Sequence, residues 1–322
     1  MQKTAGSVCF QPGRYAAIDI GTVTCRMLVA DVDARGHIEL LDREYAITNL
    51  GEKTDSTHRL LPEAIERVAT TVEGYMRVLE RFRQDGAPIA VRAIATSASR
   101  DAENAAEFQE RLAQTGVDVQ VIPGEKEAAL SFKGASSEFP GERIVVVDVG
   151  GGSTEVVAGD AGANPVWAHS FNIGCRRVTE KFLHADPPRE DQLNQARAWT
   201  HRQMVPYFDD LRSAGLLGGR LVAVAGTATS VVSMREQMQV YDSTRVHKAQ
   251  VTRAQLQDQM MRLAAMPLSA RRNVVGLDPN RAPVIVAGLG ILDEVMGLGG
   301  FPSFTVSESD ILQGVVLELA AK

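Results

Sequence analysis

Short apolar runs alternate with amphipathic segments along this chain, and that alternation is typical of an α/β protein. Apolar runs bounded by glycine, proline or polar residues predict strands, and apolar positions three or four residues apart predict helices. The clearest helix begins at Pro62, where apolar side chains follow at the spacing of one helix face. The predicted strands are 15–20, 26–31, 38–48, 89–95, 117–122, 144–149, 153–158, 166–172, 220–225 and 304–306. The predicted helices are 62–82, 101–112, 125–133, 175–183, 189–214, 252–265, 281–297 and 311–320.

The order of these elements repeats, which predicts two related units. A chain of 322 residues is long for a single core. A small, polar stretch at 134–142 separates the two halves. We therefore expect a first unit at 1–134, completed by a C-terminal helix within 307–322, and a second unit at 135–306, each an α/β arrangement around a mixed sheet.

Each half contains one glycine-rich loop directly after an apolar strand, and both loops read Asp, apolar residue, Gly, then small or hydroxyl residues. Glycine lets the backbone approach a ligand and adopt positive φ, and consecutive N–H groups in such a turn form an anion site. One such loop is also typical of an ordinary tight turn, but two matched loops predict a shared polyphosphate ligand. The loops consist of Asp19, Gly21, Thr22 and Thr24 in the first half and Asp148, Gly150, Gly151, Gly152, Ser153 and Glu155 in the second. A third glycine- and hydroxyl-rich turn follows strand 220–225 and adds Thr227.

Charged residues near these loops suggest a reaction. An aspartate cannot bind phosphate directly, but it can hold a metal ion that does, so Asp19 and Asp148 are candidate metal ligands; either could equally cap a turn. Glu127 is a candidate general base for water attacking phosphorus, although the helix dipole alone favours acidic residues in a first helical turn. Arginine forks match phosphate oxygens, and we expect a polyanion track if the basic residues cluster. Those residues are Arg26, Arg100, Arg176, Arg177 and Lys248.

Composition and charge narrow the class of partner. An aromatic share of 5% and a net charge of −6 disfavour a nucleic-acid-binding or membrane-binding surface. The three cysteines, Cys9, Cys25 and Cys175, are scattered without a C-x-x-C pair. With no signal segment and no long apolar run, these features predict a cytoplasmic protein with reduced thiols.

In combination, the motifs resemble the exopolyphosphatase and guanosine pentaphosphate phosphohydrolase (Ppx/GppA) family over residues 15–320. The resemblance rests on six segments in the family's order: 19–26, 95–104, 124–128, 148–155, 225–229 and 306–314. It implies the fold of the actin, sugar-kinase and heat-shock-chaperone ATPase superfamily, with the ligand in a cleft between two domains. It also implies dependence on Mg²⁺ and stepwise release of terminal phosphate from polyphosphate, from guanosine pentaphosphate, or from both.

By position, the resemblance assigns a role to each motif residue. Glu127 matches the family's catalytic base, and Asp148 and Glu155 match residues tied to metal and water. Arg26 and Arg100 match phosphate ligands, as does the 150–153 loop. Long members carry a further C-terminal helical region, which a short member of this kind is expected to lack; a homodimer is left open.

Two positions depart from the family pattern. The family usually has Ser-Asn-Ser after the first Asp-x-Gly, where this chain has Thr22, Val23 and Thr24. An arginine often follows Glu-Ala in the glutamate motif, where this chain has Ala129. These changes put one hydrogen bond and one positive contact in question, but they leave the base and the carboxylates in place.

The sequence therefore predicts a magnesium-dependent exopolyphosphatase. The alternatives are a guanosine pentaphosphate phosphohydrolase, a kinase of the same superfamily, and a non-catalytic sensor of polyphosphate or alarmone, because fold alone does not fix function. The sequence identifies no guanine-binding segment.

Overall fold

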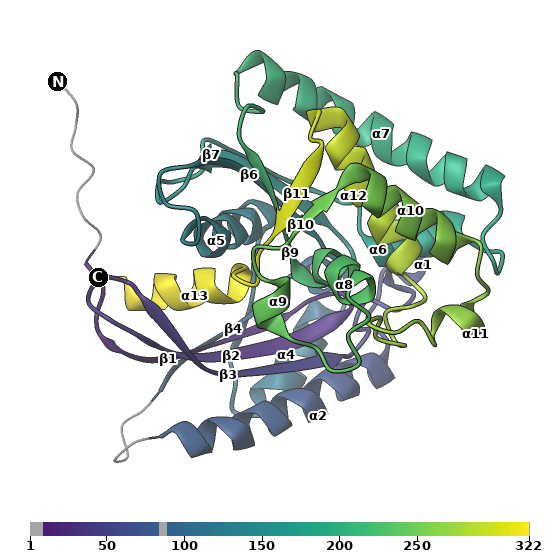
Figure 1. Ribbon diagram of the computed structural model, residues 1–322. Helices are drawn as coiled ribbons and strands as arrows, with labels where there is room; N and C mark the ends of the chain where they lie inside the picture. Colours follow the sequence, from purple (N-terminus) through teal and green to yellow (C-terminus); the bar gives the residue numbers. More distant parts are fainter. Residues whose placement is uncertain (1–8, 84–88, 322) are drawn as a thin grey trace.

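The computed structural model describes residues 9–83 and 89–321, and in that part of the chain the strands form two mixed sheets (Figure 1). The first sheet has the order β3-β2-β1-β4-β5. Strands β3, β2 and β1 pair antiparallel, whereas β1, β4 and β5 run parallel. Their bounds are β1 Gly13–Ile20, β2 Thr24–Val32, β3 Ile38–Ile47, β4 Ala90–Ala95 and β5 Val119–Val121.

The second sheet repeats this plan and extends it by one edge strand, in the order β10-β11-β9-β6-β7-β8. Strands β6, β7 and β8 form the antiparallel meander, and β9 and β11 continue it in parallel. Edge strand β10 pairs antiparallel with β11. Their bounds are β6 Arg143–Val149, β7 Thr154–Asp160, β8 Trp167–Phe171, β9 Arg220–Val224, β10 Gln250–Thr252 and β11 Ser303–Val306.

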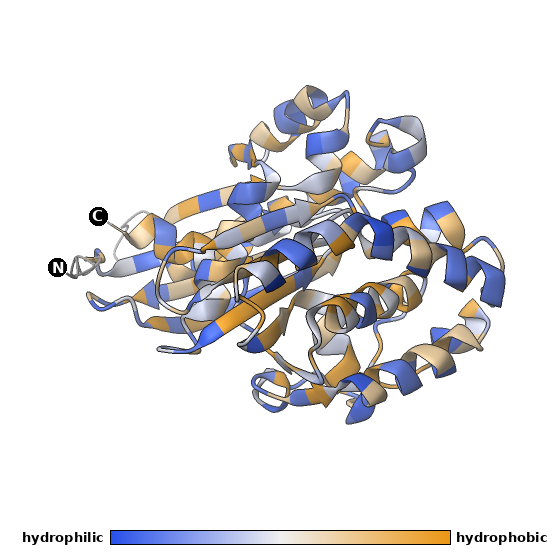
Figure 2. Cartoon of the chain, turned by 90° about the horizontal axis from the view of Figure 1, so that it is seen from above, coloured by the Kyte–Doolittle hydropathy of each residue, from blue (hydrophilic) through white to orange (hydrophobic). Residues whose placement is uncertain are grey.

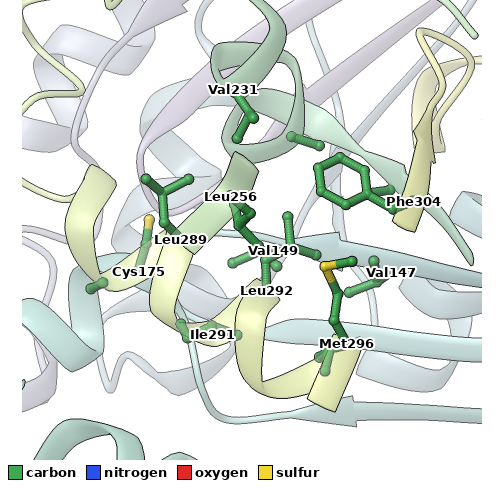
Figure 3. Close-up of a cluster of buried hydrophobic side chains, with 14 of the residues drawn as sticks. Val147, Val149, Cys175, Val231, Leu256, Leu289, Ile291, Leu292, Met296 and Phe304 are labelled. Atoms are coloured by element: carbon green, nitrogen blue, oxygen red, sulfur yellow. The ribbon is translucent and has the colours of Figure 1, made fainter. Parts of the chain in front are cut away.

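Helices cover both faces of each sheet, so β1, β2, β6, β7 and β9 are mostly buried. Figure 2 shows hydrophobic residues along many of the strands. On the first sheet, α2 (Pro62–Leu79) and α4 (Ala105–Ala113) pack on one face and α13 (Ile311–Ala320) on the other. On the second sheet, α5 (Gly124–Ser136) covers one face. The opposite face carries the largest apolar cluster, in which Leu289, Leu292 and Met296 of α12 (Ile285–Gly299) meet Val147 and Val149 of β6 (Figure 3). The remaining helices are α1 Thr54–Thr57, η1 Glu80–Phe82, α3 Ser97–Asp101, α6 Cys175–Phe182, α7 Glu190–Ser213, α8 Ala225–Arg235, α9 Ser243–Val246, α10 Arg253–Ala264 and α11 Leu268–Arg271.

The two sheets are joined by helices that each pack on the sheet they do not follow in the chain. Helix α5 follows the first sheet but packs on β6 and β7 of the second, and α13 follows the second sheet but packs on β1 and β2. The two helices touch through their backbones, because a Cβ added at Gly134 would lie 1.8 Å from the Asp310 carbonyl oxygen. The predicted boundary at residue 134 therefore falls inside α5, and the domain limits stay a prediction.

Several predicted elements differ in the structure. The helix predicted at 101–112 is two helices, because Ala102 is extended between α3 and α4. The turn predicted at 226–230 is the first part of α8, which begins at Ala225 with φ 61°. Helix α12 begins at Ile285, after Pro283, and not at 281. Among the described helices none is long and apolar enough to span a bilayer. The start of the chain, on which the expected lack of a signal segment rests, lies outside the described residues.

Candidate active site

Both glycine-rich loops close β-hairpins at matching places in the two sheets. The Gly21 N–H donates to the Thr24 carbonyl (2.8 Å), and the Gly150 N–H donates to the Ser153 carbonyl (3.0 Å). In the first hairpin Asp19 lies opposite Arg26, and in the second Asp148 lies opposite Glu155. The local sequence thus builds the same turn twice, but with different charges beneath it.

The two loops pack directly against each other. A Cβ at Gly151 would lie 2.6 Å from the Val23 side chain, and a Cβ at Gly152 would lie 2.7 Å from Thr22 Oγ1. None of the glycines at 21 and 150–152 has a positive φ, so a left-handed backbone is not the reason for glycine in these loops. Glycine is needed at 151 and 152 because the opposite loop occupies the space of a side chain.

A cavity of about 670 Å³ opens between the sheets with both loops in its wall. It is lined by twelve of the predicted site residues, Asp19, Gly21, Thr22, Thr24, Arg26, Glu127, Asp148, Gly150, Gly151, Gly152, Ser153 and Glu155. Two predicted phosphate ligands do not line it. Arg100 reaches Glu127 from α3, and Thr227 is buried with its hydroxyl donating to the Val149 carbonyl (3.1 Å).

Glu127 extends from the first turn of α5 and is 8% exposed. Arg100 Nη1 donates to its Oε2 at 3.1 Å and to the Ile122 carbonyl at the same distance. Burial raises the pKa of Glu127 to about 8; Arg100 opposes the shift, and Asp19 and Asp148 add to it. A carboxyl with this pKa has the proton affinity that general-base catalysis requires near neutral pH.

Asp148 and Glu155 lie opposite each other across the second hairpin, in the wall of the cavity. Ser131 Oγ donates to Asp148 Oδ2 (3.2 Å), and Ser170 Oγ donates to Glu155 Oε1 (2.6 Å). Burial raises the pKa of Asp148 to about 7, and burial together with Glu127 and Asp148 holds the pKa of Glu155 well above its ordinary range. Neither carboxylate forms an ion pair with a side chain in the described part of the protein.

Asp19 has a different environment from these two carboxylates. Arg26 Nη2 lies 2.6 Å from Asp19 Oδ2, and Arg26 Nη1 binds Asp310 just before α13. Burial raises the pKa of Asp19, and the attraction of Arg26 offsets part of the shift. Across the described residues, no three His, Cys, Asp or Glu side chains converge as a metal site. The predicted set of Asp19, Asp148 and Glu155 is thus not assembled as a group of three, and which residues bind metal stays a prediction.

Arg281 lines the cavity but belongs to none of the sequence motifs. It precedes α12, is 6% exposed and forms no ion pair with any described carboxylate. Its Nη2 donates to the Tyr45 hydroxyl of β3 at 3.1 Å, across the cavity. Its guanidinium lies over Gly226, where a Cβ would meet it at 2.1 Å. A buried guanidinium with only a hydroxyl partner is a binding position for an anion.

Three of the basic residues predicted to form a polyanion track, Arg176, Arg177 and Lys248, do not line the cavity. Lys248 pairs with Glu138 (3.2 Å) and lies over the Phe139 ring, away from the cavity wall. Arg176 and Arg177 of α6 also lie outside that wall, because polar partners from the first sheet's side engage both of them. The arginines that do line the cavity are Arg26, Arg43 and Arg281.

Comparison with known proteins identifies the family to which this architecture belongs. The profile of the Ppx/GppA phosphatase family matches residues 28–322. The chain belongs to this family. One curated family relative, Exopolyphosphatase 2 of Mycobacterium tuberculosis, is 38% identical over 95% of this chain and 98% of its own length.

Solved structures of the family show the same fold. An exopolyphosphatase-like protein superposes with a TM-score of 0.87 at 31% identity, covering 96% of this chain and 98% of its own. The Ppx/GppA family member of Aquifex aeolicus gives 0.78 at 28% identity, covering 96% and 97%. The predicted two-domain, actin-like ATPase fold is therefore confirmed.

Proposed function

We propose that this protein is an exopolyphosphatase, a phosphoanhydride hydrolase that releases terminal orthophosphate from inorganic polyphosphate. The observation that carries the proposal is the position of Glu127, a buried carboxylate in the wall of a cavity that two phosphate loops share. The 38% identical mycobacterial relative bears the name exopolyphosphatase and matches along nearly its whole length, which supports the same substrate class.

We further propose that the enzyme uses Mg²⁺, because more acidic than basic side chains line the cavity. Its wall contains eight carboxylates and three arginines, and a polyanion would be repelled unless cations enter with it. Carboxylate oxygens are the ligands that Mg²⁺ prefers, and this ion commonly takes only one or two of them, with phosphate and water completing the shell. Asp148 and Glu155 fit this role, since neither has a cationic side-chain partner among the described residues. Bound there, the ion would neutralise phosphoryl oxygens.

The chain's own residues perform the remaining steps of the proposal. The terminal phosphate lies in the cavity beside both loops, and N–H groups from 151–153 stabilise the charge that develops on its oxygens. The Gly150 N–H is engaged by Ser153 and is left out of this set. Glu127 removes a proton from the attacking water. Arg281 contacts a phosphate further along the chain, in exchange for its bond to Tyr45.

The test is Glu127→Gln, with phosphate release from long-chain polyphosphate as the measurement. We expect turnover to fall by about 100-fold or more, while polyphosphate binding stays measurable. Glu125→Gln is the matched control, because Glu125 lies in the same helical turn but is exposed. If the helix dipole were the only reason for these acids, both variants would behave alike; wild-type turnover in Glu127→Gln would overturn the base assignment.

A second candidate, guanosine pentaphosphate, is favoured by the apolar and aromatic part of the cavity lining. Tyr45, Met238, Tyr241 and Leu277 belong to this lining, and the two tyrosines are about half exposed. Inorganic polyphosphate has no apolar part to contact such side chains, whereas a guanine base has. Phosphate release from both substrates, measured side by side with and without Mg²⁺, would rank them; Tyr45→Ala should weaken only the guanosine substrate if this candidate is right.

A further inference from the structure

An ion-paired cluster joins the two domains outside the cavity. We call it the interdomain clamp; it consists of Arg176, Arg177 and Glu180 on α6 with Asn49, Asp55 and Asp101 on the first sheet's side. Asp101 lies within segment 95–104, one of the six segments that resemble the family, and the chemistry proposed above gives it no role. None of the six residues lines the 670 Å³ cavity.

Arg177 is the centre of the clamp, because its guanidinium bonds in three directions. Its Nε donates to the Gly152 carbonyl of the second loop (3.0 Å). Its Nη2 donates to Asp101 Oδ2 at the end of α3 (2.5 Å), and its Nη1 binds Asp55 of α1. One side chain thus connects a phosphate loop of the second domain to two carboxylates of the first.

The backbone around the clamp links it to both loops. The N–H groups of Cys175 and Arg176 donate to the carbonyls of Gly150 and Gly151 (both 2.9 Å). On the other side, Asn49 and Gly51 donate N–H bonds to the carbonyls of Val23 and Thr22 in the first loop (both 2.9 Å). Movement of α6 relative to Asn49 and Asp55 would therefore shift one loop against the other.

We propose that Arg177 is a positioning residue that makes the alignment of the two phosphate loops depend on closure of the domains. The proposal rests on the proposed function, since alignment of the loops matters only if phosphate reacts between them. Arg177 does not touch the substrate; it acts through the Gly152 carbonyl. Displacements on the scale of 1 Å in such a site lower the rate of the chemical step on the order of 10- to 100-fold.

The first test measures kinetics. Arg177→Gln should lower kcat for polyphosphate hydrolysis by about 10-fold or more with a smaller change in KM. Asp55→Asn and Asp101→Asn should each lower kcat in the same direction. Combining either with Arg177→Gln should add little, because contacting residues are not additive. Arg143→Gln, which removes an ion pair to Asp160 within the second sheet, is the control and should leave kcat unchanged.

The second test needs no turnover. Spin labels at Glu63→Cys on α2 and Arg202→Cys on α7, both exposed positions, report the distance between the domains in a Cys9→Ser background, because the other two cysteines are buried. Arg177→Gln should broaden and lengthen this distance distribution, and Arg177→Lys should restore it only in part. Unchanged distances together with wild-type kcat would overturn the proposal, as would strictly additive double variants. If the wild type released no phosphate but the distances still responded, the proposed function would fail and the link between Arg177 and closure would stand.

Discussion

The two phosphate loops are built alike and charged differently. In each, an aspartate faces a partner seven residues later across the same hairpin turn. In the first loop the partner is Arg26, which also binds Asp310, so two buried carboxylates share a cation. In the second the partner is Glu155, and neither acid forms an ion pair with a described side chain, although the charge of Arg26 also acts on Asp148.

This difference assigns the loops separate tasks. The first loop is partly compensated by Arg26 within the folded protein and can be stable before any ligand arrives. In the second, burial raises the pKa of both Asp148 and Glu155, and neighbouring carboxylates add to the shift. This loop therefore needs either protons or an external cation. A repeated backbone motif thus gives one loop with an internal cation between its carboxylates and one loop where we propose that a metal ion binds.

The largest effect should follow from removing the charge in the second loop. Glu155→Gln keeps an acceptor for Ser170 but removes a proposed metal ligand. We expect phosphate release in Mg²⁺ to fall by about 100-fold or more. Unfolding by urea without metal should show no loss of stability, since like-charge repulsion is relieved. A large loss of metal-free stability would mean that Glu155 is compensated after all.

Removing Arg26 from the first loop should instead lower the stability of the metal-free protein. Arg26→Gln leaves Asp19 and Asp310 buried without their shared cation, so the metal-free protein should lose about 3–5 kcal/mol of unfolding free energy. Arg14→Gln is the matched control, because Arg14 pairs with Asp31 on the same two strands but near the surface. That control should cost about 1 kcal/mol or less. Equal losses in the two variants would remove the distinction between the loops.

The similarity of the loops could be read from the sequence, because strand, Asp, apolar residue and Gly are local signals. Their difference in charge compensation could not, because Arg26 and Asp310 lie 284 positions apart. Arg281 and the clamp depend on the same kind of distant contact and carry no motif.

The position of Val23 shows the same limit. The sequence predicted a lost hydrogen bond there, yet its side chain is buried in the apolar cluster of the second sheet. Element order and most strand bounds followed from hydrophobic periodicity, whereas the split at Ala102 depended on tertiary contacts of Asp101 and Asn104.

A smaller effect should distinguish the glycines of the two loops. In Gly151→Ala the new Cβ would lie 2.6 Å from Val23 Cγ2, so the loops must separate. In Gly21→Ala the nearest atom would be the Thr24 carbonyl oxygen at 3.3 Å. We expect Gly151→Ala to cost about 1–3 kcal/mol of stability and Gly21→Ala clearly less. Thermal unfolding of both variants measures the difference, and equal losses would show that contact between the loops does not determine the need for glycine.

The smallest effect concerns Glu138, a carboxylate outside the loops that has cationic side-chain partners, whereas Asp148 and Glu155 form no ion pair in the described part of the chain. Glu138, which follows α5, accepts from His247 Nε2 and Lys248 Nζ (both 3.2 Å). The bond from His247, followed by that from Lys248, lowers the pKa of Glu138 to about 2 against burial. Because the folded-state pKa lies below the unfolded value, its stabilisation is complete above about pH 4.5 and is lost as the pH falls through about 2.

Glu138→Gln should therefore cost about 1–2 kcal/mol at pH 7, a value reduced by partial exposure of the pair. The cost should shrink as the pH falls towards 2 and disappear below it, where the wild-type carboxyl becomes neutral. Urea unfolding of both proteins across this pH range measures it. A cost that does not vary with pH would mean that Glu138 acts by packing or by its bond from Ser309. In that case Glu138 would not be an example of a carboxylate stabilised by nearby cations. The comparison between acids with and without a cationic partner would then depend on the two loops alone.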